Sequence, residues 1–221
     1  MWPLIKKELI VQKKMILFGL FYAVFLFFVF ANPAFQEFTY SMAAFGIAYI
    51  TIVGVAQAEY KNNSDVIINS LPLTRREVVA AKYLSILTFT AIALVMVGVV
   101  GLLFHFLLPV FNYRIINLID VLTTFACISL LASVSLPINF KTGAQWTRVV
   151  NIVVFLVIFF APAQLAGCIS QNSQDPRVGS LVGLATGDYS ALFSLTGFAV
   201  LLAIMLISYF VSLRIYMNKD F

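Results

Sequence analysis

The sequence predicts an all-α integral membrane protein with six transmembrane helices in a single domain, residues 1–221. Hydrophobic residues make up 62% of the chain and charged residues 10%, whereas soluble domains carry about 25% charged residues. Apolar runs long enough to cross a hydrocarbon core of about 30 Å recur six times. The alternating segments typical of a membrane β-barrel are absent from the sequence, so helices are expected to satisfy the backbone.

The first three predicted spans cover about 15–31, 38–58 and 83–108. Each is a run without Asp, Glu, Lys or Arg, of roughly the 20 residues that a membrane-crossing helix needs. The polar stretch 59–82 separates the second span from the third. It is the one long polar interruption in the chain.

The last three predicted spans cover about 117–136, 149–167 and 191–213. Small residues recur along the first of these, at Ala126, Ser129, Ala132 and Ser133, and allow neighbouring helices to approach closely. We therefore expect this span to be internal scaffold. Cys127 and Cys168 lie in apolar settings and are interpreted as packing residues.

The distribution of basic residues predicts the orientation in the membrane. Twelve Lys and Arg residues fall before the first span, between spans two and three, between four and five, or after span six, and the alternate loops hold two, Arg114 and Arg177. Because positive charge stays on the cytoplasmic side, both termini and the stretch 59–82 are predicted to be cytoplasmic. The net charge of +5 is this topology signal, aided by anionic lipid, and needs no nucleic-acid partner.

The predicted spans hold few groups that could drive transport or catalysis. His105 and Asp120 are the ionisable candidates, both near the outer ends of their spans, and a hydrogen-bonded structural role is the favoured interpretation for each. With one His in the chain no zinc triad can form, and neither a G-x-S-x-G elbow nor a G-x-x-x-x-G-K-[ST] nucleotide loop occurs. Any energy source must lie on another chain.

The polar stretch contains two patterns, each of which predicts the N-terminus of a helix. Ser64 can cap a helix over 65–69, where Asp65 suits the positive helix N-terminus, and Pro72 ends it. Thr74 and Glu77 then form the pattern of a capping box that begins a helix leading into the third span. The first short helix can rest on lipid or fill a groove on a partner protein.

The segment AEYKNNSDVIINSLPLTRREVVAAKYL, residues 58–84, together with the six-span layout, resembles the permease subunit of bacterial ABC-2-type exporters, in the short-permease branch. The resemblance implies an elbow helix at 2–14, with Trp2, Ile5 and Leu9 on one face against the inner leaflet. It also implies a coupling helix seated on an ATPase subunit. The ATPase-coupling residues are then Ser64, Asp65, Val66, Ile67, Ile68, Leu71, Pro72, Arg75 and Arg76.

The same resemblance implies the partners and the location. Two ABC ATPase subunits would bind ATP and Mg, so this chain itself holds no cofactor, metal or catalytic residue, and a second permease copy or a related permease would complete the transporter. The location would be the bacterial plasma membrane. A helical hairpin re-entering the outer leaflet would occupy 161–193, with Pro162, Pro176, Gly179, Gly183 and Gly187 as breakers; an ordinary surface loop is the alternative.

The substrate path implied by the resemblance runs between two permease copies. Helical spacing puts its candidate residues on one face of span two and one face of span five: Phe45, Tyr49, Ile52, Asn151, Phe155 and Phe159. Aromatic residues at this spacing also occur as simple packing. Many Phe residues and no buried charge favour an apolar or amphipathic cargo, such as a peptide toxin, an antimicrobial peptide or an antibiotic.

Two other functions remain open from the sequence. One is a six-helix substrate-capture subunit of an importer, and the other is an intramembrane enzyme that uses His105.

Overall fold

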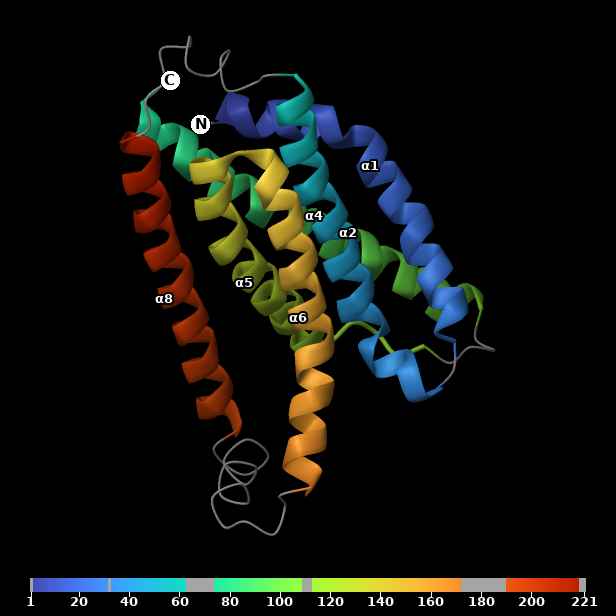
Figure 1. The fold of residues 1–221 in the computed structure, drawn as a ribbon. Coiled ribbons are helices and arrows are strands. Elements are labelled where there is room, and N and C mark those ends of the chain that lie inside the picture. Colours follow the sequence, from blue (N-terminus) through green and yellow to red (C-terminus); the bar gives the residue numbers. More distant parts are fainter. Residues whose placement is uncertain (1, 32, 63–73, 109–112, 172–189, 219–221) are drawn as a thin grey trace.

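The computed structural model describes residues 2–31, 33–62, 74–108, 113–171 and 190–218. These residues form long helices and no strand (Figure 1). The helices are α1 (Trp2–Val29), α2 (Pro33–Lys61), α4 (Arg75–Leu107), α5 (Leu118–Thr142), α6 (Ala144–Gln171) and α8 (Ser190–Met217). The all-α prediction is confirmed.

Five apolar helices in the described residues are long enough to cross a membrane. They are Pro3–Val29, Phe38–Lys61, Arg75–Leu107, Leu118–Thr142 and Leu195–Met217. A sixth apolar segment, Trp146–Phe160, is shorter and lies in α6, where the fifth span was expected. The chain is thus a multi-pass membrane protein, and the count of six spans stays a prediction.

Both termini lie at the same end of the bundle, at the top of Figure 1. The end of α2 and the start of α4 lie there too, as do the end of α5 and the start of α6 (Figure 1). We call this the basic end, because it carries Lys6, Lys61, Arg75, Lys141 and Arg214. The segments predicted to be cytoplasmic therefore share one end.

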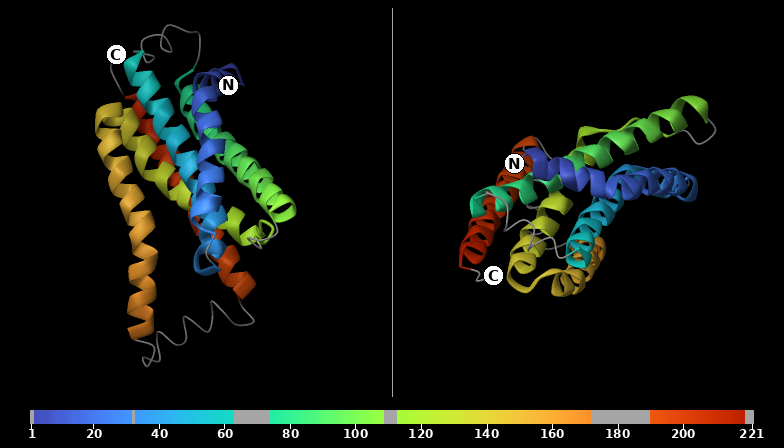
Figure 2. Two further views of the ribbon diagram at one scale, coloured as in Figure 1. Left: turned by 90° about the vertical axis from the view of Figure 1, so that its right-hand side faces the viewer. Right: turned by 90° about the horizontal axis from the view of Figure 1, so that it is seen from above.

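Helix α2 lies at the centre of the packing. It contacts α1, α4, α5 and α6, whereas α8 packs on α5 and α4 (Figure 2). Ala43, Ala44 and Ala48 on α2 are fully buried, as are Phe27 of α1 and Leu131 of α5. Small residues on α2 let four neighbours approach it.

Helix α4 begins with the predicted capping box. The Thr74 hydroxyl oxygen accepts from the Glu77 backbone N–H at 3.3 Å, and Glu77 Oε2 accepts from the Thr74 backbone N–H at 2.9 Å. Both bonds satisfy N–H groups that a helix start leaves without partners. The sequence-based prediction of this start is confirmed.

A proline inside α5 is linked to the attachment of α8. Pro137 has no N–H, so the carbonyl of Ser133 one turn earlier lacks its helical donor. The Ser208 hydroxyl of α8 donates to that carbonyl at 2.8 Å, and the same hydroxyl lies 2.7 Å from the Tyr83 hydroxyl of α4. Ser212 lies 2.9 Å from Tyr83 as well, so α8 is joined to α4 and α5 by buried hydroxyls.

At the opposite end, His105 and Asp120 have the structural roles favoured by the sequence. His105 Nδ1 lies 2.6 Å from the Tyr113 carbonyl oxygen, and no described hydroxyl bonds to that ring. Asp120 makes two 2.7 Å bonds to Arg114 and accepts from the Asn117 backbone at 2.9 Å. This geometry offers no nucleophile–base pair at His105.

Two details differ from the predictions. The expected elbow is not a separate helix: α1 is continuous, its first turns run across the basic end (Figure 1), and Ile5 is buried in the protein rather than turned toward lipid. Pro162 does not break a helix, because α6 continues to Gln171. The rest of the proposed hairpin, 172–189, lies outside the described residues.

Two glycines on α4 give opposite predictions. A Cβ at Gly101 would strike the buried ring of Tyr40, whose hydroxyl bonds to the Arg114 carbonyl, whereas a Cβ at Gly98 would meet nothing within 4 Å. We expect Gly101→Ala to lower stability by about 1–3 kcal/mol through overpacking. Gly98→Ala should instead raise it by about 0.5–1 kcal/mol through helix propensity. Thermal unfolding of the two purified variants checks this, and equal shifts would contradict the close contact of α2 with α4.

Candidate functional site

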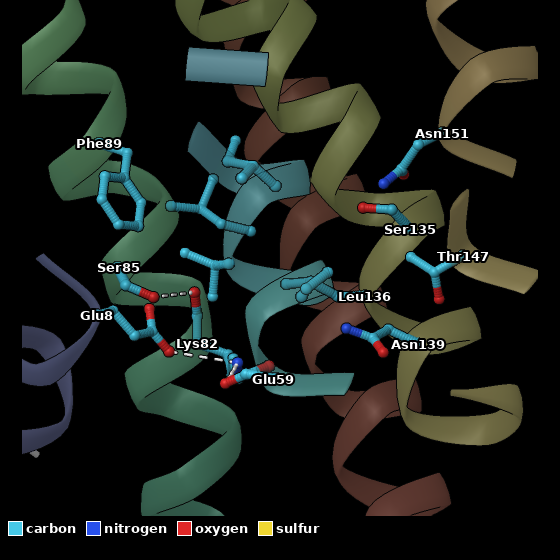
Figure 3. A pocket seen from close by; sticks show the side chains of 14 residues that line it. Glu8, Glu59, Lys82, Ser85, Phe89, Ser135, Leu136, Asn139, Thr147 and Asn151 are labelled. Carbon is cyan, nitrogen blue, oxygen red and sulfur yellow. Dashed lines mark hydrogen bonds and ion pairs between the residues drawn. The ribbon is translucent and has the colours of Figure 1, made fainter. Parts of the chain in front are cut away.

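A buried charge cluster joins three helices at the basic end. Lys82 Nζ of α4 lies 3.3 Å from Glu8 Oε1 of α1 and hydrogen-bonds to Glu59 Oε1 of α2 (Figure 3). The three side chains are 12%, 8% and 14% exposed, respectively. We call Glu8, Glu59 and Lys82 the charge cluster.

Local sequence explains the positions of the two carboxylates of the charge cluster. Ile5, Glu8 and Gln12 are spaced by three and four residues, so they share the buried face of α1. Gln12 packs against Gly54 of α2, where a Cβ would lie 2.8 Å from its Oε1. Glu59 then lies in the last turn of α2, next to α1.

The stability of the charge cluster depends on the balance between its positive and negative charges. Two carboxylates and one ammonium give a formal net charge of −1. Removing one partner of a buried pair costs about 3–5 kcal/mol, because the other charge stays desolvated and alone. The charge cluster therefore stabilises the mutual position of α1, α2 and α4 so long as Lys82 is present.

A cavity of about 30 Å³ lies beside the charge cluster. One wall carries the charge cluster with Ser85, and the other carries polar groups of α5 and α6 (Figure 3). About 10–15 Å³ is enough for one water molecule, so the cavity has room for roughly two. The polar wall residues of α5 and α6 are Ser135, Asn139, Thr147 and Asn151.

A tight turn places the α6 wall. Gly143 ends α5 with φ of 81°, a backbone conformation suited to glycine, and α6 starts one residue later. Thr147 and Asn151, four residues apart, therefore face α5 and the cavity. Asn151 is 1% exposed.

Two buried acceptor oxygens at this cavity lack partners among the described residues. They are Glu8 Oε2 and Asn151 Oδ1. A buried polar atom without a hydrogen bond costs about 1–3 kcal/mol, so such atoms indicate that a ligand or solvent supplies the donor. Both residues line the cavity from opposite walls (Figure 3).

The residues predicted for the substrate path lie next to this cavity. Ile52 and Asn151 line it, and the four aromatic residues form a row between α2 and α6. The Phe155 ring lies 5.8 Å from Phe45, 5.0 Å from Tyr49 and 6.0 Å from Phe159, measured between centroids. The structure thus brings all six residues together, but it does not test whether substrate passes there.

A model of the family described as "ABC-2 family transporter protein" matches residues 3–217. The chain belongs to the ABC-2 transporter family. The search of curated proteins and the search of solved structures gave no match. The resemblance to ABC-2 permeases is confirmed, so the chain is the permease of an ABC transporter, a membrane transport component of a family that normally works with ABC ATPase partners.

The structure describes only part of the permease's predicted coupling region. Ser64, Asp65, Val66, Ile67, Ile68, Leu71 and Pro72 lie outside the described residues. Arg76 is exposed at the start of α4. Arg75 is engaged within the chain, because its Nη1 donates to the carbonyls of Tyr216 and Met217 at 3.0 and 2.6 Å.

Sequence reasoning missed the charge cluster of the permease. Lys82 counted as a loop charge, Glu59 belonged to the motif that carries the resemblance, and Glu8 had no assigned role. The expectation that the helices bury no charge near the path is wrong, because Glu8 and Lys82 line the cavity with Ile52 and Asn151. The available signal was the spacing of Glu8 from Ile5 and Gln12, which puts an acid on a buried face.

The charge cluster predicts an order of stabilities among three variants. Lys82→Met leaves two uncompensated carboxylates and should cost about 3–5 kcal/mol of stability. Glu59→Gln combined with Lys82→Met restores the net charge of −1 and should be more stable than Lys82→Met alone. Lys61→Met makes the same chemical change at an exposed site and should be close to neutral. Thermal unfolding of the purified permease checks the order, and a double variant less stable than Lys82→Met would contradict the role of charge balance.

Proposed function

We propose that this permease belongs to an ATP-driven exporter that moves an apolar or amphipathic substrate out of the cell, such as a peptide toxin, an antimicrobial peptide or an antibiotic. Separate ATPase subunits supply the energy. They contact the permease through residues 64–72, which precede α4. Family membership supports the class of transporter, and the residues on either side of 63–73 support the site of coupling.

The observation that carries the proposal is the bond between Glu59 and Lys82, which lie on either side of residues 63–73. Glu59 precedes residues 63–73 and Lys82 follows them, and their side chains are bonded. A force applied to the segment therefore acts on α2 and α4 together. Through Glu8 it also acts on α1.

A second connection reaches the C-terminal helix. Arg75 lies two residues after residues 63–73. It bonds to the last carbonyls of α8, where the negative end of the helix dipole favours a cation. Tyr83 then bonds α4 to Ser208 and Ser212 of α8. Movement at the start of α4 would thereby reach α8 as well as α1 and α2.

The complete transporter in this proposal has two ATPase subunits that bind ATP and Mg, and two permeases, either identical or related. It sits in the bacterial plasma membrane with both permease termini and the basic end in the cytoplasm. The excess of basic residues at that end supports the orientation. Phe159, 46% exposed at the end of the aromatic row, supports an apolar or amphipathic cargo.

Co-purification with a co-expressed ATPase tests the coupling site. Asp65→Lys, or Lys in place of Val66, Ile67 and Ile68, is expected to reduce ATPase recovery or to abolish ATP-driven transport. The first change reverses the charge of the predicted short helix, and the second removes its apolar surface. Thr142→Lys adds a cation at an exposed site of the same end and should leave both unchanged. Full recovery and transport in the Asp65 and 66–68 variants would show that the ATPase binds elsewhere.

A further inference from the structure

The cavity beside the charge cluster has unused capacity to accept a positive charge. The Glu8 side chain is 8% exposed, and its Oε1 pairs with Lys82 while its Oε2 has no partner among the described residues. Lys82 is shared with Glu59, so one cation serves two carboxylates. Counted over Glu8, Glu59 and Lys82, the cluster has one negative charge in excess, in a setting where uncompensated charge is costly.

The second wall of the cavity adds an acceptor from another helix. Asn151 Oδ1 is buried and without a partner among the described residues, and Asn151 lines the cavity on the wall opposite Glu8 (Figure 3). Two orphan acceptors on opposite walls suit a ligand that only donates hydrogen bonds. A primary ammonium has three donors and no acceptor, whereas an anion would meet like charge.

The size of the cavity limits which hydrogen-bond-donating ligands can bind in it. About 30 Å³ admits an ammonium tip with a water molecule, since one water needs about 10–15 Å³. A compact charged group suits a volume of this size better than a sugar ring does. Lys7, the neighbouring cation in sequence, lines an adjoining pocket rather than this cavity.

The aromatic row continues from the cavity toward the opposite end. Tyr49 lies three residues before Ile52 on α2, and Phe155 lies four residues after Asn151 on α6, so each is one turn beyond a cavity residue. Phe159 extends the row by another turn. A polar, negative end followed by an apolar row matches a molecule with a cationic head and a hydrocarbon tail.

We propose that Glu8 and Asn151 form the head-group site for a primary ammonium carried by an amphipathic cargo, with the tail lying along Phe45, Tyr49, Phe155 and Phe159. That the bound ammonium compound is also transported rests on the proposed export function. The binding site itself stands on the geometry of the cavity. It narrows the substrate class from any amphipathic molecule to cationic ones.

The test measures binding of two matched probes to the full-length permease in phosphatidylcholine nanodiscs, which carry no net lipid charge. One probe is a dodecylamine with a free primary ammonium and a dansyl group on the far end of its chain, and the other is its N-acetylated, uncharged form. The ammonium probe is expected to bind about tenfold more tightly or better, because hydrogen bonds to charged groups are stronger than neutral ones. Equal affinity for the two probes would overturn the proposal.

Variants test whether Glu8 and Asn151 cause the preference for the ammonium probe over its acetylated form. Glu8→Gln should abolish this preference. Glu77→Gln, the same change at the exposed α4 cap, where Gln can keep the capping box, should retain it. Asn151→Asp adds a carboxylate without added bulk and should increase the preference several-fold, which keeps the test decisive if Glu8→Gln does not fold. A preference that survives in Glu8→Gln, or fails to rise in Asn151→Asp, contradicts the site.

The outcome is separable from that of the export function. If the wild-type permease did not co-purify with an ATPase, the coupling proposal would be refuted and the probe measurement would be unaffected. Conversely, a permease that assembles with its ATPase and turns over ATP but binds both probes equally would retain the proposed function and lose the ammonium site.

Discussion

The position of Lys82 between two carboxylates is the constraint on which the rest of the basic end depends. Its ammonium joins α4 to Glu8 of α1 and Glu59 of α2 in a setting where the three side chains are at most 14% exposed. In a buried site the loss of one charge is far more costly than at a surface. That single cation therefore helps to fix three helices relative to one another next to the cavity that they line with α5 and α6.

The same region of α4 is bonded on its other sides. Arg75 holds the last carbonyls of α8 and Tyr83 holds two of its serines. The start of α4 is therefore linked to α1, α2 and α8 by polar bonds, and it follows directly on the proposed ATPase-binding segment. In such an arrangement a partner that moves the segment shifts several helices together, which is how a chain without a nucleotide loop could use energy from another subunit.

Local features were predictable from the sequence, and long-range pairings were not. The Thr74–Glu77 capping box needs only a four-residue pattern. The long apolar runs locate the helices, although α1 and α4 begin well before the predicted spans. Lys82 finds Glu8 at a separation of 74 residues, and no local pattern specifies that partner. The Phe45 and Phe155 faces were each predicted from helical spacing, whereas their stacking depends on the contact of α2 with α6. Pro162 was misjudged because neighbouring groups in a membrane helix can tolerate a proline.

The most direct test of the central claim is the distance between the end of α2 and the start of α4, on either side of residues 63–73. Spin labels at Lys61→Cys and Arg76→Cys, both exposed positions, in a chain without Cys127 and Cys168, report it by double electron–electron resonance. If Lys82 fixes α2 against α4, the distance distribution is narrow with Lys82 present and broadens when Lys82→Met is added. An equally narrow distribution in the Lys82→Met variant would contradict the account.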